Sequence, residues 1–165
     1  MGNCVAVTSQ YSPAALAGSW RLIRYFREQG DRRVEPFGPH AYGHLLYAAD
    51  GRMAATLCRP DRPHLTSAPG LDWSGDPAEW AAAAQSYFAY TGSYQLVTAT
   101  ERGFIVDHQV EAALLPDWVG TSIRRWGYFE GNRMVLTTFD PALPLGDGAG
   151  STLDWVRWND AARLS

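Results

Sequence analysis

The residue with the clearest chemical potential is a histidine that stands in an apolar, alternating segment. From Phe104 to Glu111 the residues alternate strictly, so that one face carries Phe104, Val106, His108 and Val110. A period of two residues indicates a half-buried β-strand, and we place His108 on its inward face. There it would be either a core histidine satisfied by a neighbouring hydroxyl or carbonyl, or a hydrogen-bond donor and general acid–base group facing a ligand.

A tyrosine and an arginine on other expected strands share this inward orientation. Tyr94 is in phase with Leu96, and a tyrosine offers an apolar ring with one polar tip that suits the orientation of an organic ligand. Arg125 is in phase with Ile123, and an inward arginine could hold a carboxylate or an enolate. Together with the histidine, these two are the candidate catalytic residues.

The other inward positions are expected to line a ligand pocket. They follow from the phases of the strands and from an apolar stripe on the expected helix, because small-molecule pockets are lined mainly by apolar and aromatic side chains. The candidate ligand-binding residues are Tyr47, Met53, Ala55, Leu57, Trp80, Tyr87, Leu96, Phe104, Val106, Val110 and Ile123.

The sequence lacks the motifs of metal, nucleotide and covalent chemistry. His40 and His44 would lie about 13 Å apart on a strand, and no His-Glu-x-x-His or paired-cysteine pattern occurs. There is no Gly-x-Ser-x-Gly elbow or glycine-rich phosphate loop, and the absence of lysine excludes Schiff-base chemistry. Asp107 cannot pair with His108, because adjacent strand residues point to opposite faces. We therefore predict no metal and no cofactor.

The length and charge of the chain limit the classes of function. A chain of 165 residues is expected to form a single domain, residues 1–165, that needs no metal or disulfide for its stability. The formal net charge is −3 and there is no basic tract, so neither nucleic acid nor a membrane is expected as a partner. Met1–Gln10 has no secretory pattern and no long apolar run occurs, which predicts a cytoplasmic protein, either monomer or homodimer.

Eight strands and one helix are expected to position these residues. Asp76 as N-cap, Pro77 and Glu79 predict a helix over about 77–90, and residues 1–16 are expected to be a loose lead-in. The expected strands are residues 18–28, 42–49, 52–58, 92–99, 104–111, 121–129, 133–139 and 152–158.

The short connections between these strands predict a closed barrel. They imply antiparallel neighbours, and Asp50-Gly51 predicts a tight hairpin. On the first strand, Trp20, Leu22 and Phe26 share one phase and would face the same side. Eight such strands predict an all-β, up-and-down barrel with the helix inserted before the fourth strand, and a two-layer sandwich is the alternative. Eight strands leave room for packed side chains or for one small ligand.

Several segments resemble a known family. Gly18-Ser19-Trp20, at the start of the first strand, resembles the Gly-x-Trp motif of the lipocalins. The wider pattern, over residues 18–158, is similar to the small bacterial and fungal lipocalin-like domain family. Besides the strand around His108, the segments that carry it are GSWRLIRY (18–25), GHLLYAADGRM (43–53), YFAYTGSY (87–94), PDWVGT (116–121) and LDWVR (153–157).

The resemblance implies an eight-stranded barrel with an internal cavity for small apolar molecules. It also implies that Trp20 closes one end of the barrel, with an arginine packed on its ring. Arg125 or Arg157 would suit that role through cation–π stacking. If Arg125 fills it, that arginine is structural and does not meet a ligand.

We predict that the barrel binds a small hydrophobic metabolite. The leading hypothesis is a cofactor-independent cyclase or isomerase that acts on a polyketide-like or terpenoid-like biosynthetic intermediate. Such a reaction needs a shaped apolar cavity and one or two hydrogen bonds that strengthen in the transition state. The alternatives are a non-catalytic carrier of a small lipophilic molecule, and an interaction domain whose barrel is filled by side chains.

Overall fold

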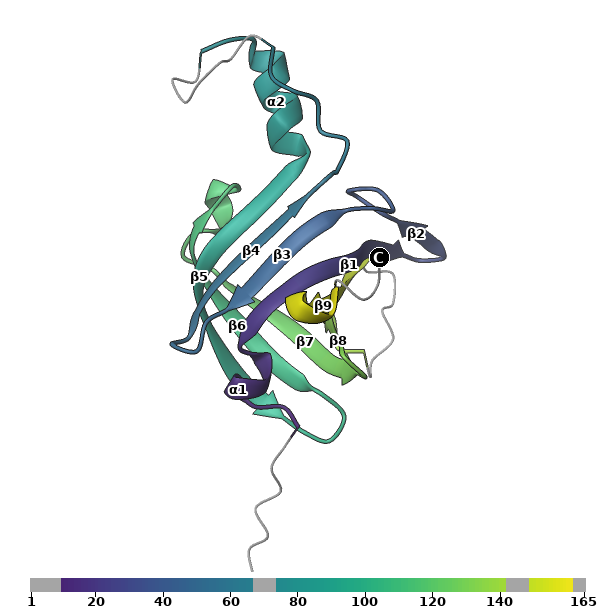
Figure 1. Ribbon diagram of the computed structural model, residues 1–165, viewed down its shortest axis with the longest axis vertical. Helices are drawn as coiled ribbons and strands as arrows, with labels where there is room; N and C mark the ends of the chain where they lie inside the picture. Colours follow the sequence, from purple (N-terminus) through teal and green to yellow (C-terminus); the bar gives the residue numbers. More distant parts are fainter. Residues whose placement is uncertain (1–9, 67–73, 142–148, 162–165) are drawn as a thin grey trace, which may run out of the picture.

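In the part of the chain that the structure describes, nine antiparallel strands form one sheet that closes into a barrel (Figure 1). The structure is a computed structural model that describes residues 10–66, 74–141 and 149–161. The first nine residues of the expected lead-in, and residues 67–73 of the segment before the helix, lie outside these ranges. No helix of the described residues is long and apolar enough to cross a bilayer.

The strands follow one another around the barrel in chain order. They are β1 (Gly18–Gln29), β2 (Arg32–Val34), β3 (Tyr42–Tyr47), β4 (Arg52–Cys58), β5 (Tyr87–Ala99), β6 (Phe104–Ala113), β7 (Ser122–Glu130), β8 (Arg133–Thr137) and β9 (Ala149–Arg157). The helical elements are α1 (Pro13–Leu16), α2 (Pro77–Gln85), the 3-10 helix η1 (Pro116–Trp118) and α3 (Trp158–Ala161).

The pairing of the first long strand with the last one closes the barrel. β1 pairs with β3 on one side and with β9 on the other, so the ring consists of eight strands. The three-residue β2 extends β1 as a hairpin outside this ring. The predicted hairpin at Asp50-Gly51 joins β3 to β4, with Gly51 at a φ of 86° that glycine adopts without strain. The expected up-and-down barrel is confirmed.

The helix is shorter than predicted. α2 has Asp76 as its N-cap, as expected, but it ends at Gln85. From Tyr87 onward the chain belongs to β5 and pairs with β4, because aromatic residues suit a strand whose neighbour is available. None of the residues of α2 is buried, and the helix projects away from the barrel (Figure 1). The helix was predicted before the fourth strand, and it precedes β5. β5 is the fifth strand along the chain because the short β2 was not predicted, but it is the fourth strand of the eight-stranded ring.

A bulge in β1 changes which residues face the interior. The register of β1 against β9 shifts between Leu22 and Arg24. Beyond this shift Tyr25 and Arg27 face the interior, while Phe26 lies on the outer face, where the guanidinium carbon of Arg24 is 4.8 Å from its ring centroid. One extra residue reverses the faces of those that follow, so the phase predicted for Phe26 was wrong.

A short helix fills the end of the barrel where β1 begins. α1 follows Tyr11 and ends at Leu16, and both side chains are buried where the sequence predicted a loose lead-in. The ring of Tyr11 packs against Phe104 and Phe129, with centroids 5.3 Å and 5.4 Å away. Figure 1 shows α1 at the opposite end of the barrel from α2. Burial of these apolar groups explains why the segment orders there.

Trp20 anchors α1 to the wall of the barrel. Its indole Nε1 donates a hydrogen bond of 2.9 Å to the carbonyl oxygen of Leu16. The guanidinium carbon of Arg157 lies 4.4 Å from the indole ring centroid, and the same guanidinium donates to the carbonyl oxygen of Ala15 at 2.7 Å. Of the two arginines that the resemblance offers for this position, Arg157 fills it, which leaves Arg125 for another role.

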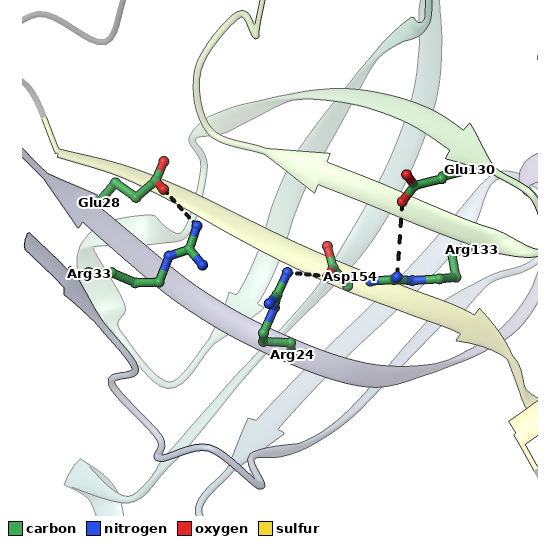
Figure 2. Close-up of polar contacts among 6 residues, drawn as sticks. All are labelled: Arg24, Glu28, Arg33, Glu130, Arg133 and Asp154. Atoms are coloured by element: carbon green, nitrogen blue, oxygen red, sulfur yellow. Dashed lines mark hydrogen bonds and ion pairs between the residues drawn. The ribbon is translucent and has the colours of Figure 1, made fainter. Parts of the chain in front are cut away.

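Ion pairs reinforce the seam between β1, β9 and β8 on the outer face of the barrel (Figure 2). Asp154 of β9 is 3% exposed. Its Oδ2 lies 3.1 Å from Nη2 of Arg24 on β1 and 2.5 Å from Nη2 of Arg133 on β8. A single carboxylate therefore links three strands at the place where the first strand of the ring meets the last.

Replacement of Asp154 by Asn should destabilise the barrel at almost constant side-chain volume, because Arg24 would lose its counter-charge and Arg133 would keep, among the described residues, only the 4.0 Å pair with Glu130. We expect the free energy of unfolding to fall by about 1–3 kcal/mol in urea denaturation. Glu28→Gln is the matched control, since it removes only the exposed pair of Glu28 with Arg33 and should have little effect. Equal losses in the two variants would contradict a special role for the seam carboxylate.

Candidate functional site

A cavity of about 620 Å³ occupies the end of the barrel opposite α1. Its lining residues lie on the distal half of β1, the end of β4, and the starts of β5, β7 and β9, which the antiparallel register brings to the same end. Arg27, Pro36 and Thr121 on the lining are also exposed, so the cavity opens to solvent there. The volume falls in the range of pockets that hold small organic ligands.

Most of the cavity wall is apolar. Aliphatic groups and one indole come from β3, β4, β7, β8 and β9, namely Leu45, Ala55, Leu57, Ile123, Leu136, Leu153 and Trp155. An aromatic rim is formed by the half-buried rings of Tyr25, Phe37, Phe88 and Trp118, and the buried ring of Tyr90 lies beside the last two. Among them Trp118 packs edge-on against Phe88, with centroids 4.9 Å apart. A molecule in this cavity would therefore meet ring faces and aliphatic groups over most of its surface.

Five of the residues predicted from the sequence line this cavity: Ala55, Leu57, His108, Ile123 and Arg125. Seven others lie in the hydrophobic core or against it without lining the cavity: Tyr47, Met53, Tyr94, Leu96, Phe104, Val106 and Val110. The hydroxyl of Tyr94 donates to the carbonyl oxygen of Ala48 at 3.0 Å, away from the cavity.

The two candidates from the predicted helix lie outside the barrel interior. Trp80 is on α2, where its Nε1 donates to the carbonyl oxygen of Ser74 at 2.8 Å. Tyr87 begins β5, and the guanidinium carbon of Arg62 lies 5.0 Å from its ring centroid. Neither side chain lines the cavity, because α2 projects away from the barrel and Tyr87 lies on the opposite face of β5 from Phe88.

Polar chemistry in the cavity centres on His108, which forms hydrogen bonds with two tyrosines. Its Nε2 lies 2.6 Å from the hydroxyl of Tyr47 on β3, and its Nδ1 lies 2.9 Å from the hydroxyl of Tyr90 on β5. Tyr47 is fully buried behind the cavity wall, whereas Tyr90 lines the cavity. The three side chains thus form a chain that runs from the core to the cavity.

The imidazole of His108 is neutral. Burial, reinforced by the positive charge of Arg125, lowers the pKa of His108 from 6.5 to about 3, and Asp107 opposes this only in part. A neutral imidazole has one N–H donor and one acceptor nitrogen. One of the two tyrosines must therefore donate to the ring and the other must accept from it.

The burial of Tyr47 decides the direction of these bonds. If Tyr47 accepted a proton from Nε2, its own hydroxyl proton would be buried without an acceptor among the described residues, which costs about 1–3 kcal/mol. We therefore assign Tyr47 as the donor to Nε2 of His108, and the Nδ1–H of His108 as the donor to Tyr90. The hydroxyl proton of Tyr90 is then available to the cavity.

Arg125 places a positive charge beside this chain. It is 9% exposed, lines the cavity, and its Nη1 donates to the carbonyl oxygen of Arg124 at 3.3 Å. Arg124 itself points outwards and pairs with Asp107 at 2.8 Å. Burial raises the pKa of the Tyr90 phenol, and the charge of Arg125 opposes that shift. The guanidinium therefore lies close enough to act on the same molecule as Tyr90.

Sequence reasoning missed Tyr90 because it fell inside the predicted helix. The aromatic run from Tyr87 to Tyr90 fits a strand, and that signal could have moved the boundary. Tyr25 and Arg27 were missed because of the bulge in β1. Trp155, which also lines the cavity, has a buried Nε1 without a hydrogen-bond partner in the described part of the chain. No signal in the sequence indicates this N–H, because its lack of a partner follows from the burial of the atom in the folded chain.

Comparisons with known proteins agree with this architecture. The model of a family described as a lipocalin-like domain matches residues 17–161. A protein of Aspergillus oryzae (strain ATCC 42149 / RIB 40), named a 4'-hydroxy-3'-methoxypropiophenone carrier protein, is 32% identical over 106 residues. The matched region covers 62% of this chain and 94% of the relative.

The lowered pKa of His108 predicts a loss of stability in acid. Between about pH 6.5 and pH 3 the unfolded histidine takes up a proton that the folded one does not, so the free energy of unfolding falls as the pH falls, with a slope approaching 1.4 kcal/mol per pH unit. His108→Gln removes this term. The difference in unfolding free energy between the wild type and the variant, measured in urea, should therefore decrease from about pH 7 to about pH 4. A constant difference would mean that His108 takes up its proton over the same pH range in the folded protein as in the unfolded one, so that its pKa is not lowered.

Proposed function

Because the chain belongs to the lipocalin-like domain family, we propose that its cavity binds and carries a small, largely apolar molecule that contains an aromatic ring. The observation that carries this proposal is the open cavity of about 620 Å³ with its aromatic rim. A barrel filled by side chains would leave no such space. Ligand burial in a cavity of this kind is driven mainly by removal of apolar surface from water.

The chemistry of the wall favours an aromatic ligand over a plain aliphatic one. Tyr25, Phe37, Phe88 and Trp118 offer ring faces and edges around the opening, and aromatic pairs gain about 0.5–1.5 kcal/mol beyond their burial. The name of the Aspergillus oryzae relative describes a carrier of a substituted phenyl ketone. A molecule of that size and class suits the cavity of this chain.

Catalysis is the second candidate, and the chain from Tyr47 through His108 to Tyr90 favours it. In a cofactor-independent cyclase or isomerase, Tyr90 would donate a hydrogen bond to an oxygen of the substrate, and Arg125 would stabilise negative charge that develops there. His108 would then be a positioning residue, since its Nδ1–H holds the hydroxyl oxygen of Tyr90. The same groups would orient a ligand in a carrier without any reaction.

A neutral naphthalene dye should bind in the cavity. N-phenyl-1-naphthylamine fluoresces more strongly in apolar surroundings, and we expect saturable binding by the wild type. Ala55→Trp should weaken it by about tenfold or more, because the indole would fill cavity volume. Ala54→Trp is the matched control, since Ala54 is on the same strand and faces outwards between buried Met53 and Ala55. Binding that is unaffected by Ala55→Trp would place the dye elsewhere and contradict the proposal.

Carriage and catalysis can be separated by the molecule that co-purifies from the producing cells. A catalyst converts one molecule into another, so Tyr90→Phe would retain unreacted substrate. That substrate would have a different chromatographic retention time from the molecule found in the wild type, with the same mass for an isomerisation and a larger mass for a cyclisation that expels water. In a carrier, Tyr90→Phe should retain the same molecule at lower occupancy, because one hydrogen bond is lost. We expect the carrier outcome in native mass spectrometry followed by chromatography. Tyr42→Phe, at an exposed tyrosine, is the control and should leave the molecule and its occupancy unchanged.

A further inference from the structure

We propose that the ligand carries an anionic oxygen, such as a carboxylate, phenolate or enolate, which is held by the guanidinium of Arg125 and the hydroxyl of Tyr90. This inference rests on the proposed function, because it assumes that the cavity takes a ligand. It adds the charge of that ligand and the two side chains that recognise it.

Arg125 carries a buried positive charge without a counter-charge. Among the described residues it is the only arginine that is buried, and none of the ion pairs that join arginines to carboxylates includes it. An arginine with this degree of burial normally pairs with an acidic group, since removing its charge from water is costly. The side of Arg125 that remains open is the side that faces the cavity.

The cavity wall offers hydrogen-bond donors and lacks acidic groups. Its described lining contains two arginines, Arg27 and Arg125, and no aspartate or glutamate, although the whole chain has a net charge of −3. The hydroxyl proton of Tyr90 points to the cavity, because its oxygen accepts from His108. Such a wall matches a ligand that accepts hydrogen bonds.

The charge of Arg125 favours an anion over a neutral acceptor. A ketone or an ester oxygen could accept from Tyr90, but it would leave the charge of Arg125 uncompensated in apolar surroundings. An anionic oxygen satisfies both groups, and charge-assisted hydrogen bonds are about twice as strong as neutral ones. Leu136, Leu153 and the other apolar side chains of the wall lower the local dielectric constant, which strengthens the attraction between the guanidinium of Arg125 and an anionic oxygen.

Two dyes that share one ring system test this inference. 8-Anilino-1-naphthalenesulfonate is N-phenyl-1-naphthylamine with an added sulfonate, so the pair isolates the contribution of an anionic oxygen. Arg125→Met should weaken binding of the sulfonate dye by at least about tenfold and change binding of the neutral dye by less than about threefold. Arg125→Lys retains the charge and should recover part of the lost affinity. Arg102→Met is the control for the loss of one positive charge, because Arg102 is exposed and does not line the cavity, and it should change either affinity little.

The outcomes separate this inference from the proposed function. If the wild type binds neither dye, the proposed function fails. If it binds the neutral dye and Arg125→Met leaves the sulfonate dye unaffected, the cavity still takes ligands and only the anion inference is overturned. Losses as large in Arg102→Met would assign the effect to the net charge of the protein and also overturn it. As a check that does not depend on a sulfonate, 2-naphthoate should displace the bound sulfonate dye better than its neutral methyl ester, and equal displacement would count against the inference.

Discussion

The closure of the sheet by the pairing of β1 with β9 is the constraint on which the rest of the structure depends. A closed ring of eight strands has no exposed edge, and each inward side chain must either pack against others or border empty space. α1 and Trp20 occupy one end of the ring. The empty space therefore lies at the other end, where the loop before β3 and the 3-10 helix η1 leave an opening.

The buried histidine shows how a residue behind the wall can set the chemistry in front of it. His108 is compatible with full burial because both ring nitrogens have partners and the ring stays neutral. Tyr47 does not line the cavity, yet its burial fixes which nitrogen of the ring carries the proton. With the proton on Nδ1, the hydroxyl of Tyr90 accepts from His108 and can donate its own proton to a ligand. A residue of the core therefore determines which hydrogen-bonding group the cavity offers.

The faces of the strands could be predicted where the register is continuous. The alternation around His108 placed four residues inward, and all four are buried. The same reasoning failed for Phe26 on β1, because the bulge in that strand adds a residue without changing the hydrophobic pattern. Tyr90 was lost because the run before it fits a helix as well as a strand, and only its pairing with β4 decides.

The site itself could be predicted only in part. Arg125 and Arg157 were equivalent candidates to cover Trp20, and the choice depends on β9 lying beside β1 in the closed barrel. A cavity was predicted, but its size and its position at one end of the barrel could not be, because its volume is a small difference between the space inside the ring and the side chains that enter it. His108 could be placed inward, but neither of its tyrosine partners could be identified from spacing.

The ion pair between Arg24 and Asp154 also has a consequence for the order of events during folding. Its partners are separated by 130 residues of chain, so the contact that completes the ring is among the most distant in the sequence and costs the most loop entropy. During synthesis the earlier strands emerge with two open edges, and the pocket does not exist until the last strand arrives. Ligand occupancy can therefore report that the whole ring has formed, and a bound molecule stabilises the entire fold rather than any part of it.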